Sequence, residues 1–198
     1  MTTVLDFLRH GEPVGGRKYR GQVDDALSEL GWAQMHAAVG EAAPWTRIVA
    51  SPLLRCRAFA EVLAAQRGLP LFFDPRLKEV GFGEWEGKSA AEIEQAAPGT
   101  LARFKADPIN ARPAGAEALP DFLARVSAAL DELVARHAGE HVLVVGHAGV
   151  MRMALAWALD IPLQQAYRIE VANASFTRLR CEGGRSTLVF HGSARVEA

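Results

Sequence analysis

The chain has 198 residues, nearly half of them apolar, and this length suits one domain with a sizeable core. Its formal net charge of −1 gives no overall field that would favour nucleic acid or an anionic membrane surface, so we expect neither as a partner. The two cysteines form no metal-ligand pattern and no disulfide framework, which suits a reducing compartment. The sequence shows no signal segment and no apolar run of the roughly 20 residues that span a bilayer, so a cytoplasmic protein is expected.

The first predicted element is a buried strand over residues 4–8, where the sequence reads "VLDFL". Arg9 and His10 follow it directly, and Gly11 then ends the run. A core strand therefore finishes by placing two cationic or titratable side chains at one edge of a sheet. The next segment, "GGRKYRG", is basic and is interpreted as a solvated loop unless it borders an anionic site.

A helix is predicted after Ser28, which can cap it, with an apolar face that includes Leu30 and nearby alanines. Residues 48–50 predict a short buried strand. Ser51 then stands where a helix N-cap is expected, and Gly68 closes the helix that follows. We interpret Ser51 as a cap and not as a nucleophile, because no G-x-S-x-G turn surrounds it.

The middle of the chain is its least regular part. "LPLFFD" predicts another strand, and residues 74–115 follow as loops around short helices near 89–106. This segment is long enough to form a cap over a site. From Leu119 onward, apolar residues recur at helical spacing until just before Gly139.

The C-terminal part repeats the opening scheme. "HVLVVG" predicts a buried strand that ends at His147, and a helix follows it. The tail predicts short strands with a hairpin near Gly183. Strands that alternate with helices indicate one α/β domain over residues 1–198, with a mostly parallel sheet that helices cover on both faces.

Polar side chains converge on one predicted sheet edge, since ligands of such sheets bind beyond the carboxyl ends of the strands. Arg9 and His10 come from the first strand, Arg55 and Arg57 from the helix after the second, and His147 from a later strand. Arginine offers a fixed fork of donors to phosphoryl oxygens, and a neutral imidazole can attack phosphorus while a second histidine donates to an oxygen. Position on the helix alone makes Arg55 and Arg57 nearly equal candidates for binding the phosphoryl group.

These residue types can stabilise phosphoryl transfer without magnesium, because the reaction needs mainly positioning and charge neutralisation. The sequence contains no GxxxxGK[ST] loop, no HExxH pair and no C-x-x-C pair. We therefore expect neither a metal site nor a cofactor.

Four sequence blocks occur in a recognisable order: "LRHGEP", "SPLLRCRAFA", "LKEVGFGEWEG" and "VVGHAGVMR". Together they resemble the histidine phosphatase superfamily, also called phosphoglycerate mutase-like. "YRGQVDDALSELGWAQ" and "FGEWEG" look most like the branch that contains alpha-ribazole phosphatase. The resemblance implies a three-layer sandwich in which a mixed, mainly parallel sheet is flanked by helices.

The resemblance also implies roles for particular residues. His10 would be the nucleophile that forms a phosphohistidine, and Arg9, Arg55 and His147 would complete the phosphate pocket. Glu79, the first glutamate of "LKEVGFGEWEG", would act as the general acid and then as the base.

Further residues of the matching blocks border this expected pocket. Gly21 and Gln22, in "YRGQ", are expected to bind the substrate. Glu84 and Glu86 compete with Glu79 for the acid role, but both are interpreted as solvated loop residues. Trp85 could either line the pocket or only pack.

The favoured function is a metal-independent phosphomonoesterase that acts on a small-molecule phosphate ester, with alpha-ribazole 5′-phosphate as the leading candidate. Two departures, Pro13 after the R-H-G-E block and Ala118 in "PAGAEA", weaken the substrate assignment more than the chemistry. The alternatives are a phosphoglycerate mutase-type phosphotransferase, a phosphatase of phosphorylated proteins and a non-catalytic phospholigand-binding module. The short chain lacks room for the larger cap insertions of mutases, which favours hydrolysis. The oligomeric state stays open.

Overall fold

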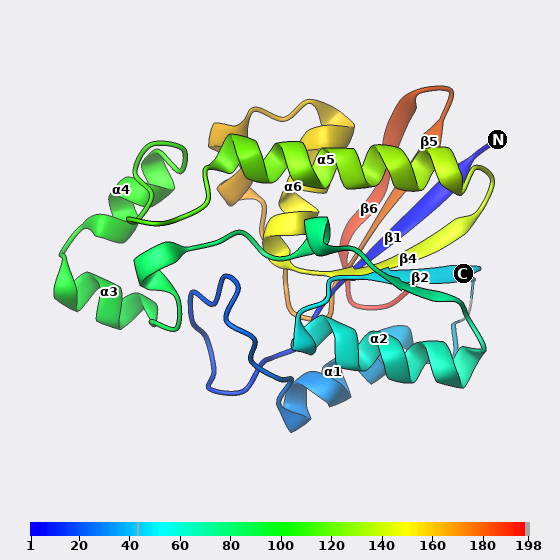
Figure 1. The fold of residues 1–198 in the computed structure, drawn as a ribbon, viewed down its shortest axis with the longest axis horizontal. Coiled ribbons are helices and arrows are strands. Elements are labelled where there is room, and N and C mark those ends of the chain that lie inside the picture. Colours follow the sequence, from blue (N-terminus) through cyan, green and yellow to red (C-terminus); the bar gives the residue numbers. More distant parts are fainter. Residues whose placement is uncertain (43, 197–198) are drawn as a thin grey trace.

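The computed structural model describes residues 1–42 and 44–196, which form one mixed six-stranded sheet between helices (Figure 1). Its strands are β1 (Thr3–Arg9), β2 (Arg47–Ala50), β3 (Leu71–Phe73), β4 (His141–Gly146), β5 (Phe176–Glu182) and β6 (Arg185–Ser193). They lie in the order β3-β2-β4-β1-β5-β6. The first four of this order are parallel, β5 runs antiparallel to β1, and β6 runs antiparallel to β5. The predicted α/β domain with a mixed, mainly parallel sheet is confirmed.

Helices cover both faces of the sheet. In Figure 1, α5 (Leu119–Arg136) and α6 (Ala148–Leu159) lie above the sheet, and α1 (Glu29–Val39) and α2 (Leu54–Arg67) lie below it. Side chains of β4 alternate between the two cores, since Val142 and Val144 join the α5 and α6 side while Leu143 and Val145 join the α1 and α2 side. A strand buried on both faces needs apolar residues at every position, which explains the unbroken apolar run.

Helix α1 begins as predicted but buries a different face. The Ser28 hydroxyl accepts a hydrogen bond from the Gly31 backbone N–H at 3.0 Å, which confirms the N-cap. The predicted apolar face was wrong except at Ala38, which is buried: Leu30 is 55% exposed, whereas Gly31 and Met35 are buried. A Cβ added at Gly11 would lie 2.2 Å from the Gly31 oxygen, so close backbone contact rotates the helix toward its glycine face.

The expectation that Ser51 caps α2 was wrong. The helix begins at Leu54, and the Ser51 backbone N–H instead donates to the Val145 oxygen at 3.0 Å, continuing the pairing of β2 with β4. The predicted end of α2 is confirmed, because Gly68 closes it in the left-handed conformation with φ 62°.

The segment 74–115 projects from the sheet on the side where β1 ends (Figure 1). It contains the 3-10 turns η1 (Pro75–Leu77) and η2 (Gly83–Trp85) and the short helices α3 (Ala90–Ala96) and α4 (Thr100–Ala106), so the helices predicted near 89–106 are confirmed. Aromatic rings hold it together: Phe104 lies 4.8 Å from Tyr167 and 5.3 Å from Trp85 between ring centroids. Its role as a cap stays a prediction.

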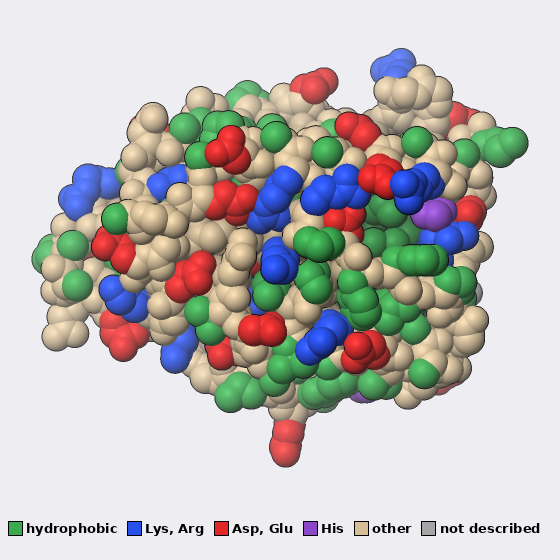
Figure 2. Space-filling model, viewed as in Figure 1, with side chains coloured by type: hydrophobic (Ala, Val, Ile, Leu, Met, Phe, Trp, Pro, Cys, Tyr) green, Lys and Arg blue, Asp and Glu red, His purple; other side chains and the backbone are tan. Residues whose placement is uncertain are grey.

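The 3-10 helix η3 (Leu163–Arg168) follows α6, and the predicted hairpin near Gly183 joins β5 to β6. Figure 2 shows positive and negative side chains interspersed along α5, where Arg125 pairs with Glu117 at 2.6 Å. Of the helices in the described parts of the chain, none has the length and apolar character needed to cross a membrane.

Candidate active site

The carboxyl ends of β1 and β4 bring two histidines together. These strands are parallel neighbours, with Arg9 opposite Gly146, so the next residue of each strand lies at the same sheet edge. The ring centroids of His10 and His147 are 5.3 Å apart, with planes at 64°. Both side chains are buried. The expected juxtaposition from distant sequence positions is therefore present.

His10 is held as a neutral imidazole with one free nitrogen. Its Nδ1 lies 2.7 Å from the Gly11 carbonyl oxygen, which can only accept, so Nδ1 carries the proton and Nε2 keeps its lone pair. Burial, followed by the positive charges of Arg9 and Arg55, holds the pKa of His10 well below its ordinary value of 6.5. An unprotonated Nε2 at the end of a rigid strand is suited to nucleophilic attack.

Two arginines supply buried positive charge beside this ring. Arg55 is 1% exposed and donates to the Gly21 oxygen at 2.8 Å and the Val23 oxygen at 2.7 Å. Arg9 donates to the Val171 oxygen at 2.6 Å, and burial lowers its pKa to about 10. Within residues 1–42 and 44–196, the buried Nε of each arginine lacks a hydrogen-bond partner. These unpaired donors could bind an anion.

Arg55 is distinguished from its competitor Arg57 by its electrostatic neighbours. The positive charge of Arg55 contributes to lowering the pKa of both His10 and His147. Arg57 is only half-buried, two residues further along α2. Arg55 is therefore close enough to both histidines for its charge to act on them, while its role in binding phosphate stays a prediction.

The Glu79 carboxylate lies against the N-terminal turn of α6. One oxygen accepts from the Gly149 backbone N–H at 3.2 Å, and the other accepts from the Val80 N–H at 2.9 Å. A Cβ at Gly149 would lie only 2.1 Å from Oε1, so the missing side chain leaves the space that the carboxylate fills. Arg125 donates to the Glu79 carbonyl oxygen at 3.1 Å, and Gln22 approaches the same oxygen at 3.4 Å.

The predicted substrate-binding pair, Gly21 and Gln22, lies in a loop tied to this region. The Glu86 carboxylate accepts from the backbone N–H groups of Gln22 at 3.1 Å and Phe82 at 2.9 Å. The interpretation of Glu86 as a solvated residue was therefore wrong, because its carboxylate joins two loops of the site. Glu84 is exposed, as expected.

The residue that the sequence interpretation missed is Ser51. Its hydroxyl lies 2.7 Å from Nε2 of His147, and both side chains are fully buried. The Cys56 sulfur lies 3.6 Å from the same nitrogen, and burial raises the pKa of its thiol to about 12. Burial, followed by the Arg55 charge, holds the pKa of His147 well below 6.5, so this ring is also neutral. The only sequence feature that could have indicated this contact is the serine of "SPLLRC", and that serine fits a helix cap equally well.

The basic "GGRKYRG" loop borders the site. The charges of Arg17 and Arg152 contribute to lowering the pKa of Arg9, after burial itself. Arg152 lies on α6, where its Nε donates to the Ile169 oxygen at 3.0 Å and its guanidinium carbon lies 5.3 Å from the Tyr167 ring centroid. The basic loop therefore adds positive charge beside Arg9 and is more than a solvated loop.

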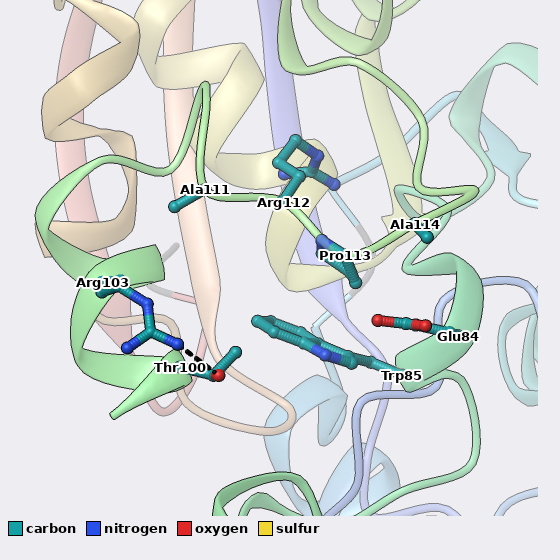
Figure 3. Close-up of a pocket in the computed structure, with 8 residues that line it drawn as sticks. All are labelled: Glu84, Trp85, Thr100, Arg103, Ala111, Arg112, Pro113 and Ala114. Carbon is teal, nitrogen blue, oxygen red and sulfur yellow. Dashed lines mark hydrogen bonds between the residues drawn. The ribbon is translucent and has the colours of Figure 1, made fainter. Parts of the chain in front are cut away.

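A separate surface hollow lies in the projecting segment (Figure 3). It has a volume of about 230 Å³, and its lining includes Trp85, Arg103 and Arg112 but neither histidine. Arg103 turns back to donate to the Thr100 hydroxyl at 2.8 Å, as the dashed line shows. Trp85 packs at 5.3 Å from the Tyr19 ring, between centroids. Over residues 1–42 and 44–196, no three His, Cys, Asp or Glu side chains are grouped so as to hold a metal ion.

Two arginines with buried Nε groups and two buried histidines thus lie near the carboxyl edge of a mainly parallel sheet, where ligands of α/β proteins bind. The chain belongs to the histidine phosphatase superfamily (branch 1), whose family model matches residues 5–193.

Several curated relatives are phosphatases of different small molecules. Glucosyl-3-phosphoglycerate phosphatase of Mycobacterium tuberculosis is 35% identical over 190 residues, which cover 88% of this chain and 84% of that protein. Adenosylcobalamin/alpha-ribazole phosphatase of Salmonella typhimurium is 28% identical over 197 residues, covering 96% of each. A bifunctional protein of Mycobacterium tuberculosis is 34% identical over 191 residues, and the chain spans about half of its length, 52%.

Solved structures give the same fold. YhfR of Bacillus stearothermophilus superimposes with a TM-score of 0.88 at 31% identity, covering 96% of this chain and 97% of that one. The mycobacterial glucosyl-3-phosphoglycerate phosphatase in complex with VO3 gives 0.87 at 32% identity, covering 96% and 98%. These relatives differ in the substrates that their names give.

Proposed function

We propose that the protein is a metal-independent phosphomonoesterase that hydrolyses a small phosphate ester through a phosphohistidine on His10. One observation carries the proposal: His10 presents an unprotonated Nε2 beside two buried arginines whose Nε donors are unpaired. A binding module needs cationic donors, but it has no use for a nucleophile with this protonation or for a carboxylate held nearby.

In the first half-reaction, Nε2 of His10 forms a bond to phosphorus as the bond to the leaving oxygen breaks. Arg9, Arg55 and His147 donate hydrogen bonds to the non-bridging oxygens, which neutralises charge in a pocket from which water is largely excluded. Glu79 gives a proton to the leaving oxygen, because an alkoxide is too basic to depart unaided.

In the second half-reaction, the Glu79 carboxylate removes a proton from water as the water oxygen attacks phosphorus. The N–P bond then breaks, its electrons return to Nε2 of His10, and inorganic phosphate leaves. The two halves use one carboxyl group in opposite protonation states, so its position matters in both.

The surroundings of the pocket bear on the substrate. Alpha-ribazole 5′-phosphate stays a candidate, because the name of one relative includes alpha-ribazole. Arg17 and Arg152 add positive charge near Arg9 beyond what one phosphoryl group requires, which favours an ester with a second anionic group. Glucosyl-3-phosphoglycerate, the substrate in the name of another relative, carries a carboxylate of this kind.

A panel of phosphomonoesters assayed with EDTA present tests the proposal. It should include alpha-ribazole 5′-phosphate and the matched pair 3-phosphoglycerate and glycerol 3-phosphate, which differ in one carboxylate. We expect phosphate release in EDTA and faster hydrolysis of the carboxylated partner. Activity abolished by EDTA and restored by a divalent ion would contradict metal independence, and equal rates for the pair would remove the second-anion preference.

The mutase alternative makes a different kinetic prediction. A mutase must keep its phosphohistidine long enough to rephosphorylate a bound product, whereas a phosphatase loses it to water. Added acceptor alcohols should therefore capture little of the phosphoryl group. Efficient transfer to an acceptor would favour the mutase instead.

A further inference from the structure

Ser51 occupies an unusual position at the end of β2. Its side chain has no exposure to solvent, and neither does that of His147. The hydroxyl oxygen lies 2.7 Å from Nε2 of His147 and accepts a hydrogen bond from the Leu53 backbone N–H at 3.3 Å. Both contacts are buried away from water, so each polar hydrogen in them needs an acceptor within the protein.

Of the two possible proton distributions between these groups, one leaves fewer buried groups unpaired. A hydroxyl holds a single proton, and within residues 1–42 and 44–196 the only acceptor in contact with the Ser51 hydroxyl is Nε2 of His147. If Nε2 carried a proton, the Ser51 oxygen would accept twice and its own O–H would be buried without an acceptor, which is costly. With that proton on Nε2, Nδ1 also keeps a lone pair that no oxygen or nitrogen donor in the described residues meets. If instead Ser51 donates to Nε2, the Leu53 N–H, the hydroxyl and Nε2 are all paired, and only the Nδ1 N–H lacks an oxygen or nitrogen acceptor in the described residues of the free protein.

Cys56 packs against the same ring without favouring either tautomer. Its thiol donates to the Gly146 carbonyl oxygen at 3.4 Å, and its sulfur lies 3.6 Å from Nε2 and 3.8 Å from Nδ1 of His147. A thiolate at this distance would attract a proton to Nε2. The thiol keeps its own proton, so the wall that it forms is neutral.

We propose that Ser51 is a positioning residue that fixes His147 in the tautomer with the proton on Nδ1. Nδ1 is the ring nitrogen without an oxygen or nitrogen partner in the described structure, so its N–H is available to a phosphoryl oxygen. Only this catalytic consequence rests on the proposed function; the tautomer itself is a property of the free protein.

Nitrogen-15 NMR of the histidine rings tests the tautomer without any substrate. In the wild-type protein at neutral pH, we expect Nδ1 of His147 to give the signal of a protonated nitrogen and Nε2 that of an unprotonated acceptor. The His147 signals are assigned by their loss in His147→Gln. A protonated Nε2 in the wild-type protein would overturn the proposal, even if every Ser51 variant failed to fold.

Substitution of Ser51 then tests the cause. Ser51→Ala should shift His147 toward a mixture of tautomers, whereas Ser51→Thr keeps the hydroxyl and should keep the wild-type signals. Ser175→Ala is the matched control, because it deletes another buried hydroxyl, which donates to the Ala172 oxygen at 2.7 Å. An unchanged tautomer in a folded Ser51→Ala protein would show that Ser51 does not set it.

Kinetics of the same variants test the consequence. Ser51→Ala should lower kcat about 10- to 100-fold, because molecules with the other His147 tautomer lack the preorganised Nδ1 N–H donor. KM should change less. Ser51→Thr should restore most of the rate. If NMR shows the predicted tautomers but no phosphatase activity exists, the proposed function fails and the structural assignment stands. If activity is present and Ser51→Ala matches the wild-type protein, the positioning role fails.

Discussion

Gly149 leaves the space that the Glu79 carboxylate occupies, so replacing this glycine should disable a catalytic group without touching it chemically. A Cβ at this position would lie 2.1 Å from Oε1 of Glu79, and real Cβ atoms essentially never approach closer than 3.0 Å. The carboxylate must therefore retreat by close to 1 Å in Gly149→Ala. A misplacement of about 1 Å can cost 10²-fold in rate, and we expect a loss of that order in kcat for alkyl phosphates.

The same change should affect stability little, because two effects oppose each other. Alanine is favoured over glycine inside a helix by about 1 kcal/mol, while an overpacked site costs about 1–3 kcal/mol. The new methyl would also meet Cε1 of Phe122 at 3.0 Å. Urea unfolding should therefore show a folded protein with at most a modest loss of stability.

The assay compares two leaving groups. Turnover of glycerol 3-phosphate should fall about 10²-fold in Gly149→Ala, whereas the first-turnover burst with p-nitrophenyl phosphate should fall far less, since nitrophenolate leaves without a proton. Gly81→Ala is the control, two residues from Glu79, because its Cβ would meet only an ordinary contact at 3.5 Å. Wild-type turnover of alkyl phosphates by Gly149→Ala would refute the reasoning.

Arg55→Ala should lower kcat on the order of 10²-fold or more and Arg57→Ala only slightly, as steady-state kinetics of the two variants would show; similar losses would contradict the assignment of Arg55. Glu79→Gln should lose about 10²–10⁴-fold toward alkyl phosphates and much less in the nitrophenolate burst, and equal losses in both would remove it from the acid role. His10 and His147 have folded-state pKa values below the unfolded value of 6.5, so below that pH the unfolded chain binds protons that the folded chain does not. Their effect is absent well above pH 6.5, and stability falls as the pH drops below it, by at most about 1.4 kcal/mol per pH unit for each histidine. The unfolding free energy, measured with urea at several pH values below 6.5, should change less with pH in His10→Gln than in the wild-type protein. An unchanged pH dependence would count against a neutral buried His10.

The sheet and the convergence of its polar residues could be predicted from the sequence because they depend on regular patterns. An unbroken apolar run predicts a strand covered on both faces, and the residue after such a strand must lie at the sheet edge. His10 and His147 meet for this reason, with ring centroids 5.3 Å apart. The order of the matching blocks added Arg55 and Glu79, which strand periodicity alone does not distinguish from Arg57 and Glu84.

The features that the sequence did not predict depend on contacts between distant segments, which local sequence does not encode. Ser51 suits an N-cap and a buried hydrogen bond to His147 equally well, and only the packing of β2 beside β4 decides between them. Leu30 was assigned to the buried face by its hydrophobicity, but backbone contact at Gly31 rotates α1 away from it. Glu86 resembles any polar loop residue until the loop that contains Gln22 folds against it.

The central claim is that His10 carries the phosphoryl group, and rapid quenching with a ³²P-labelled substrate tests it most directly. The account predicts a labelled protein within the first turnover, with a bond that is labile in acid and stable in base, as a phosphohistidine is. The label should disappear in His10→Ala, while His147→Ala should still be labelled, although slowly. A fully active His10→Ala protein, or a label that survives in it, would contradict the account.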